Sequence, residues 1–266
     1  MKKNLFILLA VIVLTGCQPT RKIAIVAHRG YWSCEQGGQS HNSIASLRAA
    51  QDFKAWGSEF DVTMTADGEL VVYHDYSIGN TVLCESNWAD LQSHRLPNGE
   101  RIPTLDEYLT QFEKSGTSMV FELKAHKTPE QERAAVEKSI ELLKSHGLFK
   151  PSRVTFISFS IAACEAFVEL APGFEVQYLA SNLSPAQCRQ KGLTGMDTYM
   201  GVLLDEQPEN ISQAHSLGMK VNCWTVDDPD SMKRLILQGV DQITTNRPDI
   251  VRNVLKEMKI KEQKSR

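Results

Sequence analysis

Residues 23–30 read Ile-Ala-Ile-Val-Ala-His-Arg-Gly, a short apolar run that stops abruptly at a histidine, an arginine and a glycine. A run of this length, rich in β-branched residues, is typical of a strand that is buried on both faces. Similar runs recur along the chain, and longer helical patterns separate them. This alternation predicts repeated βα units around a parallel sheet.

The apolar runs give a set of expected strands at 23–27, 58–63, 70–73, 119–123, 154–158, 175–179, 200–204, 220–225 and 242–244. The clearest helix between them is expected at 129–146, because Thr128 can cap its start and Gly147 can end it. A similar helix is expected at 228–237, before Gly239.

About eight such units in a body of this size predict an α/β fold, the (β/α)8 TIM barrel. A doubly wound open sheet is the alternative, but no Gly-rich phosphate loop follows the first strand. We expect one barrel domain at 23–259, with an irregular excursion at 76–103, after a short tether at 17–22. A short C-terminal tail is expected at 260–266.

The first 16 residues are organised like a bacterial signal peptide. Lys2 and Lys3 precede an apolar run at 5–14, which is shorter than the roughly 20 residues that cross a bilayer. Residues 14–17, Leu-Thr-Gly-Cys, resemble a lipobox, so Cys17 is the expected lipidation site. We expect an exported protein, lipid-anchored on the periplasmic or cell-surface side of a bacterial membrane. An ordinary cleaved signal or an uncleaved anchor is the alternative.

The net charge indicates the class of partner. Removal of residues 1–16 takes Lys2 and Lys3 with it, and the formal net charge goes from -3 to -5. This mildly acidic body has no basic stripe that would hold a nucleic-acid backbone. The expected partners are a small molecule and, through the N-terminal lipid, a membrane. No nucleic acid and no obligate protein partner are expected.

Five cysteines lie beyond Cys17 and are widely scattered, which fits buried thiols better than a disulfide framework. No Cys-x-x-Cys pair or Cys/His pair has zinc spacing. A bridge between Cys34 and Cys84 is the alternative, since both lie in loops that follow histidines of interest.

Charged and imidazole side chains recur where the expected strands end, which is where reactive groups of α/β barrels lie. They are His28, Arg29, Glu59, Asp61, His74, Glu122 and Lys124. Side chains on a strand alternate between its two faces, so Glu59 and Asp61 point the same way, as do Glu122 and Lys124. If these faces meet inside a barrel, three carboxylates and one ammonium converge. Carboxylate oxygens in such an arrangement are the ligands that a hard divalent cation, Ca²⁺ or Mg²⁺, prefers.

The chain resembles the glycerophosphodiester phosphodiesterase family through an ordered set of motifs that spans almost the whole body. They are His-Arg-Gly at 28–30, Asn-Ser at 42–43, Glu-Phe-Asp-Val at 59–62, Thr-Ala-Asp-Gly at 65–68, Val-Val-Tyr-His-Asp at 71–75, Thr-Leu at 104–105, Glu-Leu-Lys at 122–124, Trp-Thr-Val at 224–226 and Gly-Val-Asp at 239–241. The resemblance implies a (β/α)8 barrel of the phosphatidylinositol-phospholipase C-like type and metal-dependent hydrolysis of glycerophosphodiesters to glycerol phosphate and an alcohol.

The resemblance also implies roles for individual residues. His28 and His74 correspond to the acid/base pair, and the metal ligands correspond to Glu59, Asp61 and Glu122. Arg29 and Lys124 would bind the phosphate. Trp224 would form an apolar wall for the substrate, although plain core packing explains a tryptophan equally well. Phosphodiester cleavage needs such groups, because charge builds up on phosphate oxygens while one alcohol loses a proton and another gains one.

The chain departs from the family pattern in one place. The family commonly has Pro-Glu-Asn-Thr where residues 40–43 read Ser-His-Asn-Ser. Glu35 is the candidate replacement for the missing glutamate. Asn42 keeps the family position and is expected either to contact the metal or phosphate, or to cap the following helix.

Two other functions remain open from the sequence. One is a related phosphodiesterase or phospholipid head-group hydrolase that releases a different alcohol. The other is a noncatalytic lipoprotein that binds phosphorylated ligands, against which the presence of both His28 and His74 argues. A glycosidase that uses Glu59 and Glu122 would leave the histidines without a role.

Overall fold

The computed structural model describes residues 21–265. Within them, parallel strands form a closed barrel, since β1 pairs with both β2 and β11. The barrel strands are β1 (Lys22–Ala27), β2 (Gly57–Met64), β6 (Ser118–Leu123), β7 (Val154–Ser158), β8 (Glu175–Tyr178), β9 (Gly195–Tyr199), β10 (Lys220–Trp224) and β11 (Gln242–Thr245). The predicted (β/α)8 barrel is confirmed, and the open-sheet alternative is wrong.

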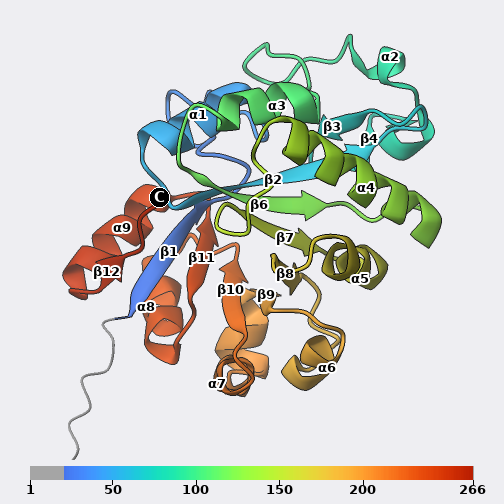
Figure 1. The fold of residues 1–266 in the computed structure, drawn as a ribbon. Helices are drawn as coiled ribbons and strands as arrows, with labels where there is room; N and C mark the ends of the chain where they lie inside the picture. The colour runs from blue at the N-terminus through green and yellow to red at the C-terminus, as the bar shows by residue number, and fades with distance from the viewer. Residues whose placement is uncertain (1–20, 266) are drawn as a thin grey trace, which may run out of the picture.

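Helices surround the barrel (Figure 1). They are α1 (Ile44–Asp52), α3 (Leu105–Phe112), α4 (Pro129–Ser145), α5 (Ile161–Leu170), α6 (Pro185–Gln190), α7 (Glu209–Ser216), α8 (Pro229–Gln238) and α9 (Pro248–Glu257). The helix predicted at 129–146 is confirmed as α4, whose N-cap Thr128 accepts a hydrogen bond from the Gln131 N–H. The helix predicted at 228–237 is α8, which Gly239 ends with a φ of 120°.

Alternate residues of each barrel strand face opposite sides, and both sides are buried. Ile25, Phe60 and Phe121 pack in the layer between strands and helices, whereas Val26 and Val120 belong to a smaller cluster with Ile157 and Trp224. This two-sided burial explains why β1 reads as a continuous apolar run. Other strands carry buried polar residues among their apolar ones.

Two expected strands need correction. The Leu70 run forms β3 (Leu70–Val72), which is antiparallel to β2 and lies outside the barrel. Asp67-Gly68, with Gly68 at a φ of 84°, makes the turn that returns the chain onto β2. The strand expected at 200–204 is also wrong, because β9 ends at Tyr199 and Val202–Glu206 forms a π-helical turn. A short apolar run does not distinguish these conformations by its pattern.

The segment at 76–103 forms an excursion with its own small elements, β4 (Ser77–Ile78), β5 (Thr81–Val82), η1 (Leu83–Glu85) and α2 (Trp88–Leu91). A separate apolar cluster that includes Val71, Leu83 and Leu91 fixes it beside β3.

The two ends of the described chain meet at one side of the barrel. Residues of β12 (Lys261–Glu262) pair in parallel with Lys22 and Ile23 at the start of β1. All five cysteines in the described residues are free, including Cys34 and Cys84. No helix of residues 21–265 combines the length and apolar character that a bilayer span requires. Cys17 lies outside the described residues.

Candidate active site

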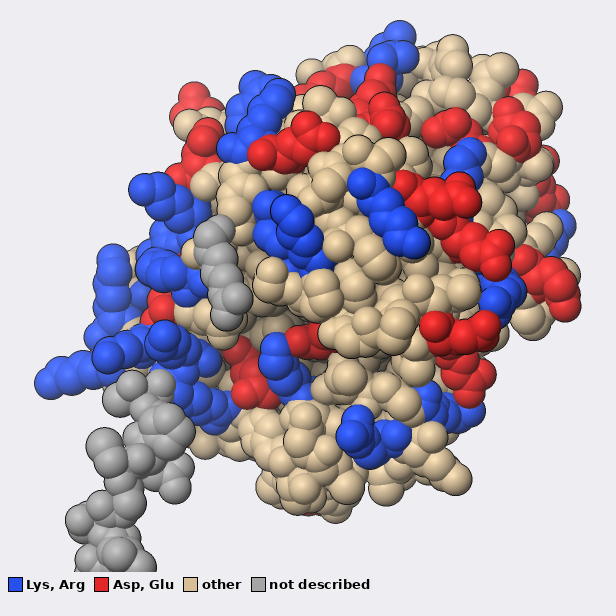
Figure 2. Space-filling view, viewed as in Figure 1, with Lys and Arg blue, Asp and Glu red and all other residues tan. Residues whose placement is uncertain are grey.

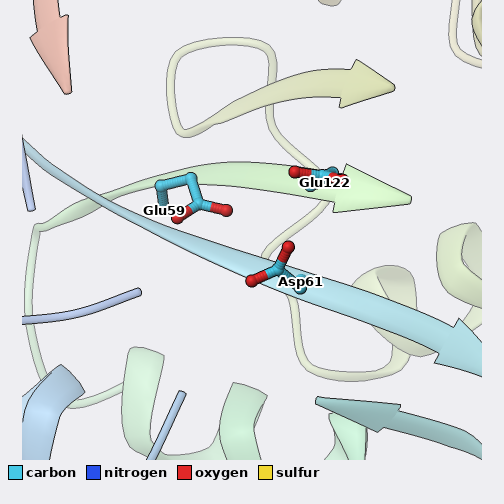
Figure 3. Close-up of side chains that lie close together, drawn as sticks. All are labelled: Glu59, Asp61 and Glu122. Carbon is cyan, nitrogen blue, oxygen red and sulfur yellow. The ribbon is translucent and has the colours of Figure 1, made fainter. Parts of the chain in front are cut away.

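Three carboxylates meet where β2 and β6 approach their carboxyl ends. Glu59 and Asp61 share a face of β2, and the strand register sets Asp61 beside Glu122 of β6. One oxygen from each of the three lies within 4.8 Å of the others, and the carboxylates converge between the two strands (Figure 3). All three side chains are buried. The convergence expected from the period-two alternation is therefore present.

Burial opposes the charge of this carboxylate group. It raises the pKa of Glu59 well above its usual value, and Asp61 and Glu122 raise it further. Burial also raises the pKa of Glu122 to about 7. Such uncompensated buried negative charge is costly unless a cation neutralises it. The oxygens match the donors that hard divalent cations prefer, so the residues present fit Ca²⁺ or Mg²⁺.

Two cationic side chains offset part of this charge. The Lys124 Nζ lies 2.9 Å from Glu122 Oε1 and 3.3 Å from Asp61 Oδ1. The Arg29 Nε lies 3.5 Å from Asp61 Oδ2. Burial raises the pKa of Asp61, but Lys124 and then Arg29 outweigh it and lower this pKa to about 2. Asp61 is thus the carboxylate that stays charged most readily.

Asn42 is directed at Asp61. Its Nδ2 donates a hydrogen bond of 2.8 Å to Asp61 Oδ2, and its Oδ1 accepts one of 3.3 Å from the Asp61 N–H. The N-cap of α1 is Ser43, whose side chain accepts from the Ser46 N–H. The helix-capping alternative for Asn42 is therefore wrong.

The first histidine is oriented by a chain of polar contacts. The His28 Nδ1 lies 2.8 Å from Asn246 Oδ1. The Asn246 Nδ2 donates to Asp227 at 2.7 Å, so its Oδ1 must accept from His28. This arrangement puts the proton of a neutral His28 on Nδ1 and leaves Nε2 free, 3.9 Å from Glu59 Oε2. Burial, and then Arg29, lower the pKa of His28 to about 3.

The second histidine is held differently. The His74 Nδ1 lies 2.6 Å from Asp75 Oδ1, and 36% of the His74 side chain is exposed. Burial lowers the pKa of His74. The negative charge of Asp61 and the hydrogen bond from His74 to Asp75 raise it in part. The neighbouring carboxylate favours the protonated ring, so His74 gains a proton more easily than His28.

Both histidines line one cavity of about 260 Å³, together with Arg29, Glu59, Glu122 and Lys124. The apolar side chains Ile157, Phe159, Leu179 and Trp224 also line it. The cavity therefore combines charged and apolar lining in one volume.

The Trp224 ring both packs and faces the cavity. Its Nε1 donates a hydrogen bond of 3.0 Å to the carbonyl oxygen of Asp197, and Phe159 and Tyr199 pack edge-on against it. The two interpretations of this tryptophan are thus compatible, since one face can pack while the other lines the cavity.

Sequence reasoning missed three residues of the site. Asp197 is buried, lines the cavity and has a pKa that burial raises to about 8. It was overlooked because the strand was expected five residues too late in the chain. Asn246 and Asp227 form the support of His28. Asn246 directly follows β11, so its place after a barrel strand was a usable signal.

The missing acid of the loop before Asn42 is not supplied by Glu35, which is exposed and lies outside the carboxylate group. His41 occupies the position instead. Its Nδ1 lies 3.3 Å from Arg29 Nη1, and its ring packs on Trp32 with centroids 4.1 Å apart.

Two family models match parts of the chain. The model of the glycerophosphoryl diester phosphodiesterase family matches residues 28–250, and that of the prokaryotic membrane lipoprotein lipid attachment site matches residues 1–18. A glycerophosphodiester phosphodiesterase of Bacillus subtilis is 28% identical over 263 residues, which cover 88% of this chain and 87% of the relative.

Solved structures are also similar. A glycerophosphodiester phosphodiesterase from Parabacteroides distasonis superposes with a TM-score of 0.86 at 40% identity, over 91% of this chain and 100% of that one. A phosphodiesterase from Oleispira antarctica, solved with the product sn-glycerol-3-phosphate, has a TM-score of 0.75 at 24% identity, over 88% and 96% of the two chains. The family match spans most of the barrel and includes every cavity residue named above, and the chain therefore belongs to the glycerophosphoryl diester phosphodiesterase family.

Proposed function

We propose that the chain hydrolyses glycerophosphodiesters to glycerol phosphate and an alcohol, with one divalent cation and with His28 and His74 as the acid/base pair. One observation carries this proposal: three buried carboxylates share a small volume, and both imidazoles line the same cavity. The family is one of phosphodiesterases, and the chain is a glycerophosphodiester phosphodiesterase. The metal requirement, the roles of the individual residues and the reaction steps are what we propose beyond this family membership.

The charges support a cation site at Glu59, Asp61 and Glu122. Three carboxylates face Lys124 and Arg29, so one negative charge is left when all are ionised. A bound Ca²⁺ or Mg²⁺ would neutralise charge on the nonbridging phosphate oxygens. Arg29 and Lys124 lie beside the same carboxylates and would bind the phosphate from the protein side.

The different surroundings of the two histidines support different roles in the first step. His28 is half-buried beside Arg29 and keeps an unprotonated Nε2, so it would accept the proton of the attacking hydroxyl. At His74 the hydrogen bond to Asp75 opposes the burial that lowers the pKa of the ring, so His74 would hold the proton that passes to the leaving alkoxide. After this step the two rings have exchanged protonation states.

A neighbouring hydroxyl of the substrate is the proposed nucleophile. Its attack breaks the bond from phosphorus to the leaving alcohol and gives a cyclic phosphate. Water then opens this ring, with His74 as the base and His28 as the acid. Direct attack by water would use the same two groups in one step. In both cases the apolar wall with Trp224 and Phe159 would exclude water from one side of the substrate.

The N-terminal match supports an anchored protein. The lipid attachment model covers residues 1–18 and so includes Cys17. We infer that residues 1–16 are a signal peptide, that Cys17 carries lipid, and that a tether at 17–22 holds the barrel domain at 23–259 on the periplasmic or cell-surface side of a bacterial membrane.

Glycerophosphocholine turnover with and without EDTA tests the proposal. We expect choline and glycerol phosphate to form, the reaction to stop with EDTA, and Ca²⁺ or Mg²⁺ to restore it. Turnover that is unaffected by the chelator would refute the metal role. Cleavage of no diester under any condition would refute catalysis and favour the alternative of a noncatalytic lipoprotein that binds phosphorylated ligands.

A further inference from the structure

Exposed basic side chains gather at the amino end of the barrel, the end opposite the candidate active site. They come from the start of β1, the turn after α1, the end of α9 and the C-terminal segment. We define this basic end face as Arg21, Lys22, Lys54, Lys256, Lys259, Lys261 and Lys264, all of which are exposed. Figure 2 shows Lys and Arg side chains crowded at the left edge of the molecule.

Direct contacts hold these segments together. Lys22 and Lys261 are partners in the pairing of β1 with β12. The guanidinium of Arg252, on α9, donates hydrogen bonds to the carbonyl oxygens of Phe53 and Lys54 at 2.8 and 3.0 Å. The basic end face is therefore one surface of the folded barrel, made by residues from both ends of the chain.

Few carboxylates neutralise this surface. Glu262 is paired with Arg252 and with Lys264, and Glu257 is paired with Lys233. Across residues 21–265, no ion pair joins a carboxylate to the remaining lysines of the face, Lys22, Lys54, Lys256, Lys259 and Lys261. The face thus carries a local excess of positive charge on a body that is acidic overall.

The length of the preceding chain places this face close to the lipid. Three residues separate Cys17 from Arg21, so four extended steps span at most about 14 Å. The charge of Arg21 on this face then lies within one or two Debye lengths of the bilayer surface, since this length is about 8 Å at physiological ionic strength. A basic patch beside a lipid anchor adds electrostatic attraction to anionic lipids.

We propose that the basic end face binds anionic phospholipid head groups of the bilayer that holds the Cys17 lipid. The barrel then stands on the membrane by its amino end. A barrel strand of six residues spans about 20 Å, so the candidate active site opens on the far side, toward the aqueous compartment. Substrates would arrive from solution as free diesters, and a phospholipid still embedded in the same bilayer would not reach the cavity. This inference rests on the proposed lipid anchor.

Hydrogen exchange of the full lipidated chain on vesicles tests the inference. One set of vesicles contains phosphatidylcholine only, and the other also contains phosphatidylglycerol. We expect the backbone amides of residues 21–27 and 252–264 to exchange more slowly on the anionic vesicles, and those of the excursion at 76–103 to be unchanged. Equal exchange on both vesicles, or protection of the excursion instead, would overturn the proposal.

Matched variants test the role of charge. Lys54→Gln with Lys256→Gln and Lys259→Gln should abolish the difference between the two vesicles. The control removes the same charge at the other end of the barrel, through Arg95→Gln, Arg101→Gln and Lys127→Gln, and should keep the difference. Flotation with phosphatidylcholine vesicles tests the anchor itself, and glycerophosphocholine turnover in detergent tests the enzyme. These two assays distinguish a wrong lipid-anchor or enzyme assignment from a wrong proposal for the basic end face.

Discussion

Asn42 makes two hydrogen bonds to Asp61, one from its amide to the carboxylate and one to its carbonyl oxygen from the Asp61 N–H. Asn42 itself has a φ of 56°. The loop that departs from the family pattern therefore still supports the proposed metal ligand, because it orients Asp61 from the side away from Lys124.

Replacement of Asn42 should weaken cation binding. Asn42→Ala removes both hydrogen bonds, and loss of such a support typically costs about 10- to 100-fold in metal affinity. Titration calorimetry with Ca²⁺ and Mg²⁺ measures this loss. Gln39→Ala is the matched control, because Gln39 has the same φ of 56° but an exposed side chain. If both variants lost the same amount of cation affinity, the cause would be backbone strain and not the two hydrogen bonds to Asp61.

The two proposed acid/base groups should be needed for turnover but not for folding. His28→Ala and His74→Ala are expected to lower kcat by about 10²- to 10⁴-fold, the range for loss of a general acid or base. Their circular dichroism spectra should match that of the parent chain. His215→Ala is the control, since this ring pairs with Asp241 on the surface. Near-normal kcat in either site variant would remove that histidine from the mechanism.

The support of His28 should affect rate more than substrate binding. Asn246→Ala removes the acceptor that fixes the Nδ1 proton of His28. The wrong tautomer then becomes available, and we expect kcat to fall about tenfold or more while KM changes little. Steady-state kinetics on glycerophosphocholine separate the two parameters. A rise in KM with kcat preserved would mean that Asn246 contacts the substrate instead.

The buried carboxyl of Asp197 predicts a pH-dependent stability. Burial raises its pKa from 3.8 to about 8, so the folded chain holds a proton that the unfolded chain releases. Stability therefore falls as pH rises between these two values. Asp197→Asn has no such proton. The unfolding free energy of this variant, relative to that of the parent chain, should therefore increase with pH across that window and level off above it. Urea unfolding at several pH values measures the difference, and a constant difference would contradict this assignment.

The sequence allowed prediction of those features that depend on short-range pattern. Glu59 and Asp61 were assigned to one face because strand side chains alternate, and the register with β6 then brought Glu122 beside them. The same reasoning gave α4, whose cap and terminal glycine are local signals. Such features need no knowledge of distant contacts.

Other features depended on contacts that a linear pattern does not contain. Asp197 was hidden because the apolar residues at 200–204 resemble a strand, whereas they form a π-helical turn. The link from Asp227 through Asn246 to His28 joins residues about 200 positions apart, and its hydrogen bonds exist only in the closed barrel. No spacing along the chain indicates that these groups meet.

Equilibrium binding of Ca²⁺ or Mg²⁺ to the chelator-treated chain tests the central claim most directly. We predict one ion per chain, retained in His74→Ala and lost or greatly weakened in Glu59→Gln, Asp61→Asn and Glu122→Gln. The absence of saturable binding, or binding that these three substitutions leave unchanged, would contradict the proposed cation site.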